Sequence, residues 1–180
     1  MRRVASPLAL LLGALSTTAT PGLAQLGELQ IGVVGSYGTS NAYGPGAGLV
    51  LGVATGRLAY VGLRWTYYAG ATTAGVTTRA QAFAVDLGIY IPVRALEVVP
   101  GVSLGAMRFA QIVGGARAHK VEFLAAPGLA IEVHVARVAL IPELQYSLAG
   151  DPELAQPVHQ HGLVASLRLV IPIEVGRIRR

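Results

Sequence analysis

The sequence predicts an all-β fold, an eight-stranded antiparallel up-and-down transmembrane β-barrel that follows a cleaved signal peptide. Three observations carry this prediction. First, 53% of the 180 residues are hydrophobic and only 13% are charged, whereas a soluble domain has about a quarter of its residues charged. Second, apolar residues alternate with small or polar ones in eight segments. Third, long and short links alternate between these segments, as in an up-and-down barrel whose tight turns share one end.

The first 24 residues form the predicted signal peptide. Arg2 and Arg3 precede an apolar run at residues 8–15, and residues 21–24 end in the small residue Ala24, which suits cleavage before Gln25. The apolar run is too short for a membrane-spanning helix, which needs about 20 residues. We therefore expect residues 1–24 to be removed and residues 25–180 to form one exported barrel domain in the cell outer membrane.

Charge and cysteine content exclude several other functions. The formal net charge is +5, but the basic residues are scattered and Lys120 is the single lysine. A nucleic-acid-binding protein would carry a basic stripe or helix, so we expect no nucleic-acid partner. The absence of cysteine excludes disulfides and thiolate metal sites. We expect no cofactor.

The strand prediction depends on alternation. In residues 120–135 one face is wholly apolar, including Val121, Phe123 and Leu129, and the other is small or charged, including Gly128 and Glu132. Frequent glycine and abundant Val, Ile, Tyr and Thr disfavour helices there. The eight predicted strands are residues 28–36, 47–54, 58–68, 82–91, 95–110, 120–135, 138–148 and 162–174. Most have about the ten residues that a tilted membrane-spanning strand needs.

The links between these strands predict the topology. Three are short, at residues 55–57, 93–94 and 136–137. Four are long, at residues 36–46, 69–79, 111–119 and 149–160. We therefore expect four long loops at one end of the barrel and tight turns at the other.

The acidic residues indicate which face points inward. Seven of the nine acids lie on the small-residue faces, and the other two, Asp151 and Glu153, lie in a long link. An all-apolar exterior would aggregate in water, so its solvent is lipid. The polar face then fills a narrow lumen. We expect a buried network of ion pairs and hydrogen bonds formed by Arg64, Asp86, Glu97, Glu122, Glu132, Arg137, Glu143 and Arg168.

Aromatic residues gather at the strand ends that lead into the long links. They predict one interfacial girdle formed by Tyr37, Trp65, Tyr67, Phe83, Phe109, Phe123 and Tyr146, with Tyr68 beside it. The opposite girdle is nearly absent, since Tyr90 faces inward by parity. The alternative explanation is the general preference of aromatic residues for strands.

Together, the signal peptide, the eight alternating strands, the link pattern and the aromatic belt resemble the small eight-stranded outer-membrane barrels of the OmpA/OmpX kind, over about residues 26–176. The resemblance implies a fold and a membrane but no functional residue. It also implies contact with outer-membrane lipid and with the barrel-assembly machinery, and we expect a monomer.

Two features disagree with a regular barrel. Pro100, Pro127 and Pro142 fall inside predicted strands, where proline removes a hydrogen-bond donor, so we expect bulges or local breaks there. Arg108 falls on the lipid face by strict parity. Either it reaches the lipid head groups, or a bulge near Ala106 shifts the register.

The sequence also contains parts of a hydrolase site. Ser147, Asp151, Glu153, His159 and His161 cluster around the last long link, and Glu132 and His134 lie near a short turn. A nucleophile, a base and an orienting acid could form a triad, but no known esterase motif occurs. Two loop histidines without thiolates are weak metal ligands, so we expect neither a metal site nor an enzyme.

We therefore expect an integral outer-membrane barrel with a structural, adhesive or interaction role. Its four outward loops would contact any extracellular ligand. The alternatives are a narrow channel for small or apolar solutes and an outer-membrane lipid-modifying enzyme.

Overall fold

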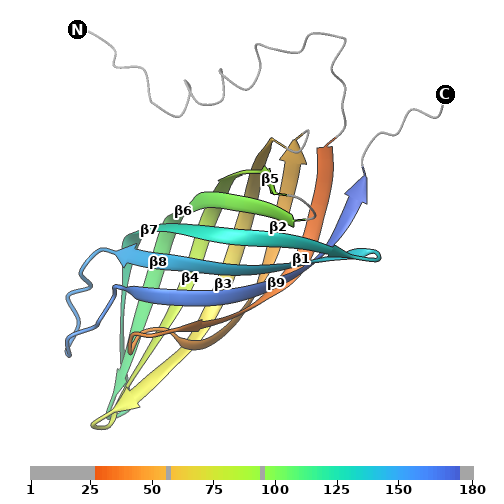
Figure 1. Ribbon diagram of the computed structural model, residues 1–180. Helices are drawn as coiled ribbons and strands as arrows, with labels where there is room; N and C mark the ends of the chain where they lie inside the picture. The colour runs from red at the N-terminus through yellow and green to blue at the C-terminus, as the bar shows by residue number, and fades with distance from the viewer. Residues whose placement is uncertain (1–26, 56–57, 94–95, 175–180) are drawn as a thin grey trace, which may run out of the picture.

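A computed structural model describes residues 27–55, 58–93 and 96–174, so the predicted signal peptide lies outside the described residues. These residues form β-strands joined by turns and loops (Figure 1). The strands are β1 (Gly27–Gly38), β2 (Gly44–Thr55), β3 (Ala59–Thr73), β4 (Val76–Ile89), β5 (Ile91–Val93), β6 (Leu96–Val113), β7 (Ala116–Val135), β8 (Val138–Ala149) and β9 (Gly162–Glu174). None of the described segments is a helix long and apolar enough to cross a membrane.

The strands form one closed antiparallel sheet. Its order is β4-β3-β2-β1-β9-β8-β7-β6-β5, and β4 also pairs with β6, which closes the barrel. The three residues of β5 continue β4 along β6 in the same register, so β4 and β5 act as one strand. The barrel is therefore eight-stranded, which confirms the predicted fold class.

Over the body of each long strand, side chains alternate between the exterior and the lumen. On β7, Val121, Phe123 and Leu129 are exposed on the outer wall, whereas Leu124 and Ala130 are buried. The other long strands follow the same period, and their exposed residues are predominantly Leu, Ile, Val and aromatic. The outer wall is thus an apolar band, which only lipid or another apolar partner can cover favourably.

Two of the four predicted loops are hairpins. Residues 69–79 belong almost wholly to β3 and β4, which are joined by a turn at Ala74 and Gly75. Residues 111–119 belong to β6 and β7, joined at Gly114 and Gly115. All four turn residues have positive φ, the conformation that two-residue hairpins require. The prediction of four long loops is wrong, because paired strands extend into two of them.

Two loops remain at this end, which we call the loop end, and the short turns form the turn end. The loops span residues 39–43 and 150–161. The first docks on a bulge in β3, where the register against β4 shifts between Tyr68 and Ala71. There the backbone amide of Gly70 donates to the carbonyl oxygen of Tyr43 at 2.9 Å. Gly70 has φ 68°, and a Cβ there would clash with the backbone of Thr78.

The strand prolines interrupt the sheet without shifting it. Pro127 and Pro142 each lie in a gap of the β7–β8 ladder, and Pro100 lies where β6 passes the break between β4 and β5. In all three places pairing resumes in the same register. Of the two expected forms, the structure has local breaks at these prolines rather than bulges, because a lost hydrogen-bond donor alone does not insert a residue.

The register of β6 places Arg108 outside and Phe109 inside. β6 pairs with β4 and β7 without any shift near Ala106. Arg108 is therefore exposed on the outer wall, whereas Phe109 is 0% exposed in the lumen. The prediction of Phe109 in the outward girdle is wrong, and Tyr68 is likewise buried.

The apolar band predicts a position-dependent penalty for charge. Leu63 lies on the outer wall at the level of Arg64, whereas Val113 is next to the Gly114 turn beyond the band. In phospholipid vesicles we expect Leu63→Arg to lower the free energy of unfolding by about 2–4 kcal/mol, and Val113→Arg by about 0–1 kcal/mol. Denaturant titration measures both. Equal losses would contradict the placement of the band.

Candidate functional site

A layer of buried polar side chains crosses the lumen at mid-height. Along β3, Arg64 lies between Tyr60, in an apolar cluster at the turn end, and Tyr68, in another at the loop end. Arg64 and Asp86 are 6% and 5% exposed. We call this the lumen layer and define it as Arg64, Asp86, Ser103, Glu143, Gln145 and Arg168.

Arg64 is the centre of the lumen layer. Its Nε donates to Asp86 Oδ2 at 2.8 Å, and one terminal nitrogen donates to both carboxylate oxygens of Glu143 at 3.0 and 2.8 Å. The other terminal nitrogen donates to Gln145 Oε1 at 3.2 Å. Ser103 Oγ donates to Asp86 at 2.6 Å and accepts from Gln145 Nε2 at 2.8 Å. The guanidinium thus joins β3, β4 and β8 across the lumen.

Arg168 balances the charge of the layer. Its Nε lies 3.6 Å from Glu143 Oε2, and its guanidinium carbon lies 5.4 Å from the ring centre of Tyr60. Two arginines therefore face two carboxylates, Asp86 and Glu143. A buried charge is tolerated only when it is paired, and this layer is neutral as a whole.

The remaining four predicted members of the lumen network lie elsewhere. Glu132 belongs to a separate cluster at the turn end, and Glu97 and Glu122 are half-buried outside the lumen layer. Arg137 is exposed in the turn between β7 and β8. For these four the prediction of a single network is wrong, because parity identifies a residue's face but not its height in the barrel.

The turn-end cluster brings together possible metal ligands. Glu28, Glu132 and His134 hold ligand atoms within 4.8 Å of one another, and His134 Nε2 lies 3.2 Å from Glu132 Oε1. Both carboxylates already accept hydrogen bonds from the amide of Gln30, and Glu132 also accepts one from the Tyr90 hydroxyl at 3.1 Å. The arrangement satisfies the acids with protein donors.

Tyr43 closes the loop end of the lumen. Its side chain is 0% exposed, its hydroxyl donates to the carbonyl oxygen of Gln160, and it shares a second hydrogen bond with Ser147 Oγ, both at 2.6 Å. Its ring packs edge-on against Tyr68 with centres 5.1 Å apart. Burial raises the pKa of the Tyr43 hydroxyl to about 12, although the hydrogen bond with Ser147 opposes the shift.

Side chains of the barrel rim hold the longer loop. The amide of Gln111 donates to the carbonyl oxygen of Gln156 at 2.8 Å and accepts from its backbone amide at 3.0 Å. The backbone amide of His159 donates to Asn41 Oδ1 at 3.0 Å. Both loops are therefore fastened to the barrel and to each other.

The candidate hydrolase residues are not assembled into a triad. Ser147 is 3% exposed and engaged with Tyr43, and His161 Nε2 contacts the carbonyl oxygen of Ala149 at 3.0 Å. Within the described part of the chain, no hydrogen bond joins Ser147 to His159 or to His161.

Six of the seven predicted girdle residues lie on the outer wall. Trp65 pairs with Phe83, and Phe83 and Phe123 both pair with Ala106, so these residues form one row across β3, β4, β6 and β7. Tyr37 and Tyr146 are exposed on the wall, and Tyr67 is half-buried there.

The sequence-based prediction left several buried polar residues out of the lumen network. Ser103 and Gln145 share the inward parity of their charged neighbours, which could have identified them. Gln30 also has inward parity on its strand, and this signal could have identified it as a buried polar residue. Tyr43 lies in a loop outside any alternating segment, and no pattern marks it.

Solved structures share this fold. Neisserial surface protein A aligns with a TM-score of 0.57 at 14% identity, over 83% of this chain and 96% of that one. The N-terminal β-barrel domain of Pseudomonas aeruginosa OprF aligns at 0.54 and 12% identity, over 82% and 99%. A major outer membrane protein from Thermus thermophilus aligns at 0.54 and 12%, over 83% and 99%.

These likenesses confirm the resemblance as one of fold: the chain has the fold of the small eight-stranded outer-membrane barrels. No protein-family model matches the sequence, and the comparison with curated proteins gives no match.

Removing the central cation should destabilise the barrel. Arg64→Met leaves Asp86 and Glu143 without their main partner, and we expect a loss of about 3–5 kcal/mol in the free energy of unfolding. The exposed Arg137→Met is the matched control, with an expected change within about 0.5 kcal/mol. Adding only Asp86→Asn to Arg64→Met makes the layer neutral again, with Glu143 still beside Arg168, and should recover much of the loss. Similar losses for Arg64→Met and Arg137→Met would refute this role.

Tyr43 should make stability depend on pH in the alkaline range. Its pKa is 10.0 when unperturbed and about 12 in the fold, so its contribution is complete below pH 10 and is lost as the pH rises through about 12. We expect the stability difference between wild type and Tyr43→Phe to shrink across this window. Unfolding titrations at a series of pH values measure it, and a constant difference would show that the hydroxyl is not buried.

Proposed function

We propose that this chain is an integral outer-membrane protein with a sealed lumen, whose role is structural, adhesive or interactive through its loop end. The supporting observation is the neutral lumen layer packed between two apolar clusters. Such a barrel provides a rigid anchor. Its apolar outer wall fits lipid, where a closed sheet leaves no backbone group unpaired.

The loop end supplies the surface for interaction. The β3–β4 and β6–β7 hairpins project from this end beside the 150–161 loop (Figure 1). Gln111 fastens that loop to β6 through Gln156. In this proposal, the binding surface consists of two hairpins and two fastened loops instead of the four long loops that the sequence predicted.

The sealed lumen supports this role over that of a channel. The hollow beside the lumen layer has a volume of about 20 Å³, room for about one water molecule. The proposal also includes no enzymatic step. It is supported there by the hydrogen bond of the Ser147 hydroxyl with Tyr43 and the contact of the His161 ring with the carbonyl oxygen of Ala149.

The absence of cysteine from the chain allows a direct test of orientation. Ala116→Cys places one exposed thiol at the tip of the β6–β7 hairpin, and Arg137→Cys places one at the turn end. We expect a membrane-impermeant maleimide to label Ala116→Cys on intact cells and to label Arg137→Cys only after the outer membrane is permeabilised. The reverse pattern would overturn the proposal.

A further inference from the structure

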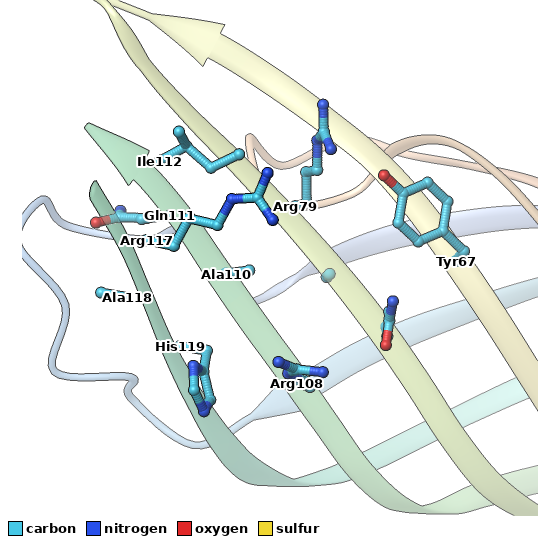
Figure 2. Close-up of a pocket in the computed structure, with 11 residues that line it drawn as sticks. Tyr67, Arg79, Arg108, Ala110, Gln111, Ile112, Arg117, Ala118 and His119 are labelled. Carbon is cyan, nitrogen blue, oxygen red and sulfur yellow. The ribbon is translucent and has the colours of Figure 1, made fainter. Parts of the chain in front are cut away.

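The outer wall carries a basic hollow just beyond the aromatic row. It has a volume of about 240 Å³ and lies over β4, β6 and β7. Arg79, Arg108, Arg117 and His119 are arranged around Ala110 in this hollow, with Tyr67 at its side (Figure 2). We call these four basic residues the wall cluster.

Strand register determines the height of the wall cluster. The row of Trp65, Phe83 and Phe123 marks one level on the wall. One step of two residues toward the loop end, about 7 Å along a strand, Tyr67 pairs with Gln81, which pairs with Arg108. Aromatic rows mark the boundary between hydrocarbon and head groups, so the wall cluster begins at the head-group level.

The next two steps along the strands are also basic. Arg79 and His119 both pair with Ala110, and Arg117 pairs with Ile112. The cluster therefore spans three successive rows, with small or apolar residues of β6 between the cations. This leaves an open space between β4 and β7 into which the charged groups can reach.

The wall cluster has no acidic counterpart. Among the residues that the structure describes, every ion pair of an arginine involves Arg64 or Arg168, and none involves Arg79, Arg108 or Arg117. Like charges on adjacent strands repel each other, so three unpaired guanidinium groups around one hollow favour an anion between them. Arginine binds phosphate through two parallel hydrogen bonds.

We propose that the wall cluster binds the phosphate of a lipid head group at the outer boundary of the membrane. The hollow opens sideways from the wall, in the layer where lipid phosphates lie, and Ile112 and Tyr67 border it with apolar surface suited to the adjoining lipid. This inference rests on the membrane placement proposed above. It adds a ligand class and a site that are separate from the loops.

Trp65 is a built-in reporter of this site. It is the single tryptophan of the chain, it is exposed on the wall, and it lies one step below Tyr67. The test reconstitutes the protein in phosphatidylcholine vesicles that contain either brominated phosphatidic acid or brominated phosphatidylcholine. Bromine quenches tryptophan fluorescence on contact, so excess quenching by phosphatidic acid measures its preference for the wall near Trp65.

We expect wild type to prefer phosphatidic acid, with roughly a fivefold contribution from each arginine. The triple variant Arg79→Gln, Arg108→Gln, Arg117→Gln should lose the preference. Arg137→Gln, which removes an exposed arginine at the turn end, should keep it. Inorganic phosphate in the aqueous phase should not abolish it, because a lipid anchored beside the hollow is already concentrated there.

Each contrary result has its own meaning. An equal preference for phosphatidic acid in wild type and in the triple variant would overturn the site. Complete competition by inorganic phosphate would also overturn it, because the ligand would then be soluble phosphate. Circular dichroism and vesicle flotation are measured on the same samples. Wild type that fails to fold with the vesicles would overturn the membrane placement itself, whereas wild type that folds without preference would overturn only the lipid site.

Discussion

Closure of the sheet determines where every side chain of this barrel can lie. β1 pairs with β9 along its length, and β4 pairs with β6, so no long strand has a free edge. Backbone groups are then satisfied within the wall, and the exterior can be apolar throughout. Closure also leaves a side chain only two environments, lumen or outer wall, and the alternation in the sequence follows from that restriction.

The same restriction explains which features could be predicted. Strand number and the inward position of Arg64 and Asp86 followed from alternation, because a charge on the outer wall is costly within the apolar band. Beyond the band neither face must be apolar, so the pattern disappears although β3, β4, β6 and β7 continue. The Gly114–Gly115 pair was the available signal for a hairpin there. The aromatic character of Phe109 favours the girdle, but its parity on β6 places it in the lumen.

Contacts between distant segments could not be predicted. Tyr43 meets Ser147 and Gln160, which lie more than a hundred residues away in the chain. Likewise, parity placed Glu143 and Glu132 on one face of the barrel but could not show that Glu143 joins Arg64 while Glu132 joins Tyr90. The height of each residue along the barrel axis depends on strand register, which the sequence pattern leaves open. The molecule that results is filled inside and carries Arg79, Arg108 and Arg117 outside, and for this reason the two proposals made above concern the loop end and the outer wall.

Closure of the sheet produces a barrel whose apolar outer wall requires lipid as its solvent. The most direct measurement is the migration of the membrane-extracted protein on a detergent gel with and without boiling. A closed barrel resists the detergent until it is heated, so the account predicts two distinct positions for the unboiled and boiled samples. A single position, together with release of the protein from membranes by a carbonate wash, would contradict it.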